Sequence, residues 1–205
     1  QLGVNLTSGL GSGANVDIGR GAAKETEEKI RAWVSEFELI FITAGMGGGT
    51  GTGAAPVIAD IARSENTLTV GVITLPFDFE GSQRMRVAKE GLLILEKLVD
   101  TLVVIPNQNL FAISDVNTTL SDAFLSADEV LRDAIRSITD LIVLPGLINL
   151  DFADVKAVIT KPGRAMLGSG EAKGENRALD AAEAAIANPL LETFSIKGAK
   201  GLLIN

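Results

Sequence analysis

The chain has 205 residues, of which 46% are hydrophobic and 21% charged, and its formal net charge at pH 7 is −8. This composition is typical of a folded α/β protein, and the acidic balance argues against nucleic acid as a partner, because phosphate backbones require clustered Lys and Arg. Cys and His are both absent, which excludes disulfides, thiol nucleophiles, and the commonest general base and metal ligand.

Two further features bear on location. No apolar run reaches the roughly 18 residues of a membrane span, and the first residues do not read as a signal peptide. We therefore expect a cytoplasmic protein without direct membrane insertion. The chain begins at Gln1 and stops within the apolar stretch at residues 198–205, which predicts a fragment of a longer protein.

The first predicted elements are a loop and a helix. Residues 9–21, GLGSGANVDIGRG, predict a glycine-rich loop. A helix should follow it, because Ile30, Trp33, Val34 and Phe37 have the i, i+3, i+4, i+7 spacing of one buried face.

Three apolar segments, at residues 39–44, 68–76 and 101–106, predict buried strands. One helix, beginning near Ala54 and Pro56, should separate the first two strands, and a second helix should precede the third. The inward positions of that second helix are Met85, Ala88, Leu92, Leu95 and Val99. Apolar strands that alternate with helices predict an α/β fold with a parallel sheet flanked by helices, in which ligands bind at the carboxyl ends of the strands.

The last predicted elements are helices. A long central helix is expected over residues 120–144, and an Ala-rich helix over residues 175–188. The inward stripe of the long helix is Leu120, Phe124, Leu131, Ile135, Ile138 and Ile142. We place one domain at residues 1–144, including the long helix, and an acidic loop with the start of a smaller α+β domain at residues 145–205.

Six glycines lie within the nine residues GMGGGTGTG, between the first strand and its helix. Successive N–H groups at such a place can surround an anion, and glycine permits positive φ and close approach of a phosphate. The hydroxyls of Thr50 and Thr52 are further donors, and the lysine-bearing P-loop motif is absent. A tight strand-to-helix turn is the simpler alternative, and residues 49–54 also match the G-x-G-x-x-A pattern of a dinucleotide loop.

The earlier loop contains GSGAN at residues 11–15, a second run of N–H groups that suits a terminal phosphate. Two glycine loops favour a triphosphate over a single pyrophosphate. A solvent-exposed turn is the alternative for this loop taken alone.

These motifs resemble the tubulin/FtsZ superfamily. The sequence GMGGGTGTGAAP resembles its signature loop, and PFDFEGSQRM, PNQNLF, DAF and GLINLDFADV follow the order and spacing of its bacterial cell-division members. The resemblance covers the whole chain. It implies a GTP-binding sheet, a long central helix, GTPase activity and head-to-tail filaments at the division site. It also implies that a first strand with its own glycine loop precedes Gln1. The rest of the C-terminal sheet, and a tail that binds other division proteins, should follow Asn205.

The resemblance also implies roles for individual residues. The γ-phosphate would lie near Ser12, Gly13, Ala14 and Asn15. The diphosphate would be bound by Gly47, Gly48, Gly49, Thr50, Gly51, Thr52 and Gly53, and Gly45 would belong to the same nucleotide site. The ribose and phosphates would contact Glu80 and Arg84, and the sugar and base would contact Asn107. Guanine would stack on Phe124, and its N1–H and 2-amino group would be read by Asp128.

Spacing adds support for the last pair. Phe124 and Asp128 are four residues apart, one turn of helix, so they share a face on which one can stack while the other accepts hydrogen bonds. Core packing of Phe124 and a solvated Asp128 are the alternatives.

An acidic motif, NLDFAD, follows the long helix and contains Asn149, Asp151 and Asp154. Its two carboxylates can orient a water and a cation for attack on a γ-phosphate, or they can cap a helix. A helix of 20 residues separates Phe124 from this motif by ~30 Å. The two ends can therefore meet only between subunits, which predicts a head-to-tail assembly with the active site completed by the neighbour's Asp151 and Asp154.

The expected ligands are GTP or GDP and Mg²⁺, although no dedicated set of metal ligands is visible. One alternative is a nucleotide-linked structural subunit without turnover. Another is a dinucleotide-dependent oxidoreductase with Asp78 at a ribose, which the absence of His and Tyr weakens.

Overall fold

The centre of the fold is a four-stranded parallel sheet. Its strands are hydrogen-bonded in the order β1 (Leu39–Gly45), β2 (Leu68–Leu75), β3 (Thr101–Pro106) and β4 (Gly163–Ala165). Leu39 pairs with Leu68, Val70 with Thr101, and Thr101 with Gly163. The structure is a computed structural model that describes residues 1–112, 118–143, 151–160, 163–166, 168, 170–187, 199–202 and 204.

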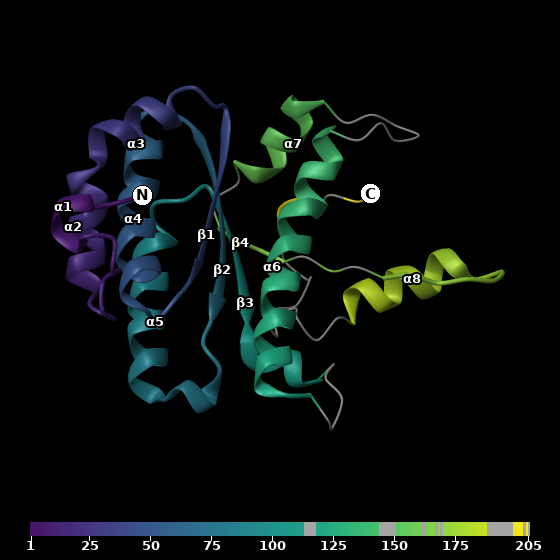
Figure 1. Cartoon of the computed structure of the whole chain (residues 1–205). Coiled ribbons are helices and arrows are strands. Elements are labelled where there is room, and N and C mark those ends of the chain that lie inside the picture. The colour runs from purple at the N-terminus through teal and green to yellow at the C-terminus, as the bar shows by residue number, and fades with distance from the viewer. Residues whose placement is uncertain are drawn as a thin grey trace.

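Helices cover both faces of this sheet (Figure 1). One side carries α1 (Val4–Thr7), α2 (Val16–Glu25), α3 (Glu27–Val34), α4 (Gly49–Ser64) and α5 (Ser82–Leu95). The other side carries α6 (Leu120–Val143) and α7 (Phe152–Ile159), while α8 (Arg177–Ile186) projects away from the sheet. Two 3₁₀ helices, η1 (Asp78–Glu80) and η2 (Asn107–Ala112), follow β2 and β3. The predicted α/β fold with a parallel sheet flanked by helices is confirmed.

Two apolar cores hold the layers together. Ile73 of β2 belongs to the core shared with α3, α4 and α5, whereas its neighbour Val72 belongs to the core shared with α6 and α7. Successive side chains of a strand point to opposite faces, so a strand covered on both sides must be apolar throughout. This requirement explains the continuous hydrophobic run of β2, whose residues are nearly all buried.

Two predictions about buried faces were wrong. Trp33 and Phe37 are 57% and 44% exposed and contact each other at a ring distance of 5.1 Å. Phe37 lies beyond the end of α3 at Val34, so helical spacing does not apply to it, and Trp33 lies within α3 on its exposed side. At the start of α6, Leu120 and Phe124 are exposed as well. The small residues Ala123, Ala127 and Ala134 make up most of the buried stripe there, which extends to Ile138.

Two helix boundaries also differ from those expected. α4 begins at Gly49, five residues before Ala54, and α2 begins at Val16, inside the segment expected to be a loop. Glycine has a low helix propensity, so both segments were expected to be loops. In the structure, close packing between the helices overrides that propensity.

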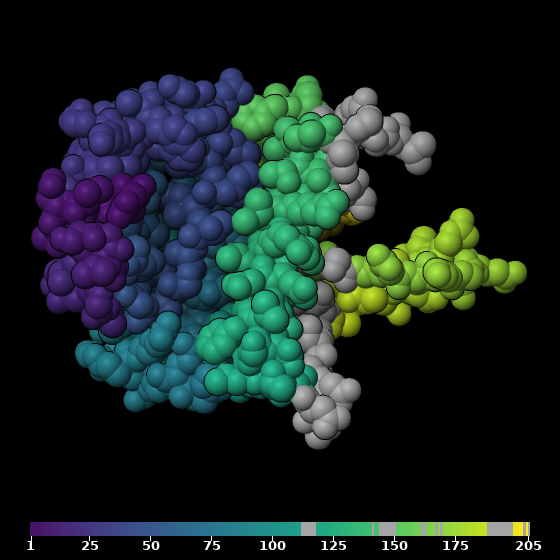
Figure 2. Space-filling view, in the orientation of Figure 1, coloured from purple at the N-terminus to yellow at the C-terminus, as the bar shows by residue number. Residues whose placement is uncertain are grey.

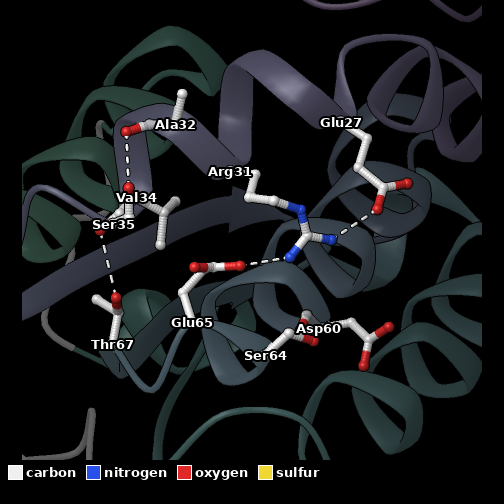
Figure 3. Close-up of polar contacts among 9 residues, drawn as sticks. All are labelled: Glu27, Arg31, Ala32, Val34, Ser35, Asp60, Ser64, Glu65 and Thr67. Carbon is white, nitrogen blue, oxygen red and sulfur yellow. Dashed lines mark hydrogen bonds and ion pairs between the residues drawn. The ribbon is translucent and has the colours of Figure 1, made fainter.

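Arg31 joins α3 to the C-terminal end of α4 (Figure 3). Its guanidinium donates hydrogen bonds to Glu27, one turn earlier at 2.9 Å, and to Glu65, the C-cap of α4. The bond to Glu65, followed by the bond to Glu27, raises the pKa of Arg31 above its usual value. Nearby, the Thr67 hydroxyl donates to the Val34 carbonyl at 3.3 Å. These contacts hold the end of α4 that lies farthest from its glycine-rich start.

The described residues beyond 150 contain α7, which packs on the sheet, the strand β4 and the isolated helix α8. β4 lies beyond residue 144 in sequence, yet it pairs with β3 in the main sheet. α8 has no buried residue, and Figure 2 shows it standing clear of the body. The division at residues 144 and 145 stays a prediction, since residues 144–150 lie outside the described part of the chain. Among the helices described, none is long and apolar enough to cross a membrane.

Candidate functional site

A cavity of about 200 Å³ opens at the carboxyl ends of the strands. It is bounded by the ends of β1 and β2, by η1 and the first turn of α5, by the start of η2, and by α6. Its lining residues are Gly45, Met46, Thr74, Pro76, Glu80, Arg84, Asn107, Phe124, Ala127 and Asp128. Six of the residues predicted to bind nucleotide therefore come together from five separate segments.

Four lining residues were missed by the sequence analysis: Met46, Thr74, Pro76 and Ala127. Thr74 and Pro76 stand at the end of β2, where the strand-end rule predicts ligand contacts. That signal was available for these two. Ala127 lies between Phe124 and Asp128 on α6, and its small side chain leaves the cavity open; no sequence pattern marks it.

Glu80 and Arg84 form one wall of the cavity. The Arg84 Nε lies 3.1 Å from Glu80 Oε2, and Glu80 Oε1 accepts the Phe77 N–H at 2.8 Å. These contacts join η1 to the first turn of α5 and leave the Arg84 side chain half exposed. The wall thus presents a fixed carboxylate and a guanidinium that can still meet an anion.

Asn107, at the first position of η2, is the most unusual group in the cavity. Only 6% of the residue is exposed, and its Oδ1 has no hydrogen-bond partner among the described residues. A buried polar atom left unpaired costs about 1–3 kcal/mol. Such an atom at the edge of a cavity indicates a place where a ligand donates a hydrogen bond.

An aromatic cluster that sequence reasoning missed holds Phe124 at the cavity mouth. Phe77 is fully buried, and its ring meets the Phe124 ring edge-on at 5.4 Å. Phe79 and Phe111 pack against Phe77 from other sides, at 4.9 and 5.4 Å. Phe124 itself is exposed, so its ring has a free side. Asp128, one turn later, is exposed on the same side of α6 and lines the same cavity.

The glycine-rich segment is part loop and part helix. Gly47 has φ 95°, which glycine adopts without strain, and Gly48 is the N-cap of α4. Gly49, Gly51 and Gly53 are helical. The first N–H groups of a helix have no partner within the helix, so the start of α4 can bind an anion beside the cavity.

The helical glycines have a second function, in packing. A methyl group on Gly53 would lie 2.2 Å from the Val16 carbonyl oxygen, and one on Gly49 would lie 2.6 Å from the Asn15 nitrogen. The backbone of α4 therefore lies directly against the start of α2, which no side chain at these positions would permit.

The two threonines of the segment differ. Thr50 is exposed, and its hydroxyl donates to Ser12 Oγ at 3.1 Å, which joins the two glycine loops. Thr52 is 4% exposed, and its Oγ1 accepts the Gly47 N–H at 2.8 Å. The Thr52 oxygen is thus used within the protein, and a contact of its hydroxyl with a phosphate stays a prediction.

In the first glycine loop, too, neighbouring residues differ in what they do. Gly13 and Ala14 both have positive φ, at 55° and 60°, and Ser12 is buried beneath them. Asn15 is the N-cap of α2, where its Oδ1 accepts the N–H groups of Asp17 and Ile18 at 2.9 and 3.3 Å. The Asn15 Oδ1 is therefore occupied by the helix.

A second cavity, of about 190 Å³, lies among the N-terminal segment, this loop, α2 and Thr50 of α4. It is lined by Gln1, Leu2, Thr7, Gly9, Gly11, Ser12, Gly19, Ala22 and Thr50. Thr50, near the start of α4, therefore contributes to this second cavity.

α7, whose first residues belong to the acidic motif, lies near the C-terminal end of α6 (Figure 1). Asp151 is the N-cap of α7, and its Oδ1 accepts the Asp154 N–H at 2.9 Å. The 24 residues of α6 span about 36 Å. Neither carboxylate reaches the cavity of its own chain, and Asn149 lies outside the described residues. Among the described residues, no group of three or more acidic side chains forms a metal site.

Comparisons with known proteins agree with this geometry. Residues 1–115 match the tubulin/FtsZ family GTPase domain, and residues 163–205 match the FtsZ family C-terminal domain. The cell division protein FtsZ of Rickettsia felis is 58% identical over 205 residues, which are 100% of this chain and 45% of that protein. FtsZ of Wolbachia pipientis is 58% identical over 217 residues, covering 100% of this chain and 69% of that protein.

A solved structure gives the same result. The empty FtsZ dimer of M. jannaschii has a TM-score of 0.88 and 52% identity, over 93% of this chain and 55% of that chain. The chain spans about half the length of several of the relatives it matches.

Proposed function

Because the chain belongs to the tubulin/FtsZ family, we propose that its strand-end cavity binds GTP and GDP and that the protein hydrolyses GTP during bacterial cell division. The observation that carries this proposal is the convergence of Glu80, Arg84, Asn107, Phe124 and Asp128 on one cavity beside the start of α4.

The nucleoside fits the cavity as follows. Guanine stacks on the free side of the Phe124 ring, and the Asp128 carboxylate accepts hydrogen bonds from N1–H and the 2-amino group. A carboxylate suits guanine, because this base presents two adjacent donors there. Adenine presents no such pair, so the same carboxylate discriminates against it. The unpaired Asn107 Oδ1 accepts a hydrogen bond from the sugar or the base.

The phosphates lie along the start of α4. The N–H groups of Gly49, Thr50 and Gly51 face the diphosphate, where the helix end adds partial positive charge. Arg84 contributes the nearby side-chain cation. The loop at residues 12–15 approaches the γ-phosphate, where the Thr50–Ser12 hydrogen bond supports it.

Hydrolysis needs a second chain. The carboxylates of Asp151 and Asp154 lie at the end of α6 opposite the cavity, about 30 Å from Phe124 along the helix. A head-to-tail contact brings these residues of one subunit to the nucleotide of the next, where they orient the attacking water. The dimeric FtsZ structure of M. jannaschii supports self-association as a family property. The same contact, repeated, builds a filament.

Mg²⁺ is expected to accompany the nucleotide. The described residues contain no cluster of acidic side chains that forms a metal site. We therefore assign no protein ligand to Mg²⁺ and no reaction step to it. We further propose a cytoplasmic location at the division site. A subunit that binds GTP and assembles without turnover is the second candidate.

GTP turnover per subunit, measured across a wide range of protein concentrations, tests the shared site. We expect a rate near zero at low concentration that rises above a threshold. A constant, nonzero rate of GTP turnover per subunit at all concentrations would refute the shared-site proposal. Assembly without phosphate release would favour the structural subunit.

Base recognition is tested separately with Asp128→Asn and a matched control, Glu129→Gln, at the next exposed position. Asp128→Asn should weaken GDP binding by about tenfold or more, through loss of two charge-assisted hydrogen bonds. Binding of ADP should remain weak in both variants. Equal GDP affinity in the two variants would remove Asp128 from the site.

A further inference from the structure

Thr52 is the fourth residue of α4 and is nearly fully buried. Its Oγ1 accepts the Gly47 N–H at 2.8 Å. Of the two threonines in the glycine-rich segment, this one is buried, whereas Thr50 is exposed. The Thr52 hydroxyl holds the backbone of the preceding loop.

Gly47 is confined on its other side by Arg84. A methyl group added to Gly47 would lie 2.7 Å from the Arg84 carbonyl oxygen and 2.8 Å from its Cγ. Arg84 in turn pairs with Glu80, and both line the nucleoside cavity. Gly47 is thus the point at which the glycine loop meets the wall of the nucleoside cavity.

The Thr52 side chain is itself held in place. A methyl group on Gly91 of α5 would lie 2.3 Å from Thr52 Cγ2 and 2.8 Å from Met46 Cε. The Thr52 methyl group therefore fills the space left by Gly91. A β-branched side chain packed in this way keeps one rotamer, which fixes the direction of its hydroxyl.

We propose that Thr52 is a positioning residue that sets the phosphate-binding start of α4 in register with the nucleoside cavity. By accepting the Gly47 N–H, Thr52 keeps this group directed into the protein. The N–H groups that follow, at the start of α4, then keep a fixed direction toward the diphosphate. This inference rests on the proposed binding of guanine nucleotides.

The test compares the affinities for GDP and guanosine, because guanosine fills the nucleoside cavity without using the phosphate cradle. Thr52→Val keeps the shape of the side chain and removes the acceptor, whereas Thr52→Ser keeps the acceptor and removes the methyl group. We expect Thr52→Val to weaken GDP binding about tenfold while guanosine binding stays unchanged. Thr52→Ser should retain most of the GDP affinity.

Two further variants guard against a purely structural effect. Thr69→Val removes another buried hydroxyl, at the opposite end of β2, which donates to the Thr67 carbonyl at 3.1 Å. In Thr69→Val, the ratio of GDP affinity to guanosine affinity should equal that of the wild-type protein. Gly91→Ala displaces the Thr52 side chain without altering its hydroxyl and should lower the ratio, which provides a second route if Thr52→Val does not fold.

Each result is decisive. Rescue by Thr52→Ser, together with faster amide hydrogen exchange of Gly47 in Thr52→Val, supports the inference. An unchanged ratio in folded Thr52→Val overturns it, as does an equal loss in Thr69→Val. If the wild-type protein binds neither GDP nor guanosine, both the proposed function and the inference that rests on it are refuted. Binding of GDP that Thr52→Val leaves intact refutes the inference alone.

Discussion

Gly19 of α2 lies against Gly49 of α4 so closely that a methyl group on Gly19 would be 2.2 Å from the Gly49 carbonyl oxygen. The contact is backbone to backbone, and Gly53 repeats it one turn later against Val16. The glycines of the signature segment therefore serve two purposes. Some provide the conformation of the loop, and others allow α2 to support the start of α4.

This contact predicts that Gly19→Ala destabilises the fold. The added methyl group meets backbone, which cannot rotate away, so the free energy of unfolding should fall by roughly 1–3 kcal/mol. Denaturant unfolding measures this change. Gly21→Ala, in the same helix, is the matched control, because its methyl group would meet only the end of the Leu6 side chain at 2.8 Å. Equal losses in both variants would contradict the close contact.

The unpaired oxygen of Asn107 predicts opposite effects on stability and binding. Asn107→Leu removes a buried acceptor that lacks a partner, so the nucleotide-free protein should be stabilised by up to about 1 kcal/mol. GDP affinity should fall about tenfold, because the ligand loses that acceptor. Thermal unfolding with and without GDP reports both quantities. A loss of stability without nucleotide would show that Asn107 has a partner of its own.

Asp151 has two roles that substitution can separate. Its Oδ1 caps α7, and Asn caps a helix as well as Asp does. Asp151→Asn should therefore leave the free energy of unfolding unchanged while abolishing GTP turnover, whereas Asp151→Ala should cost about 1 kcal/mol as well. Denaturant unfolding and phosphate release distinguish the two roles. Normal turnover in Asp151→Asn would leave Asp151 as a helix cap alone.

The start of α6 should respond to acid. The Asp122 carboxylate accepts hydrogen bonds from the hydroxyl and the N–H of Thr119, at 2.6 and 3.0 Å, which lower the pKa of Asp122. A lowered folded-state pKa means that the stabilisation is present above the ordinary Asp value of about 3.9 and is lost as pH falls through the folded value.

Unfolding measured from pH 7 downward should therefore show the unchanged protein more stable than Asp122→Asn at neutral pH, and the two should converge in acid. Phe124, half a turn beyond Asp122, should lose its fixed position as the Asp122–Thr119 hydrogen bonds are lost. A difference between the two proteins that does not vary with pH would contradict a role for the charged carboxylate.

Local patterns determined a large part of this protein. Apolar runs located β1, β2 and β3, because a strand covered on both faces needs nonpolar residues at every position. The four-residue spacing of Phe124 and Asp128 placed both on one side of α6, and the length of that helix placed Asp151 far from them. These are properties of consecutive residues, so they can be read from the chain directly.

Only the tertiary structure decided how the glycines and threonines are used. Whether Gly49 serves a loop or a helix depends on the distance to α2, and whether Thr52 faces ligand or protein depends on Gly47 and Gly91. In the same way, Trp33 has the spacing of a buried residue but lies on a surface that no element covers among the described residues. Contacts between segments distant in the chain set these outcomes, and hydrophobic periodicity within one segment carries no information about them.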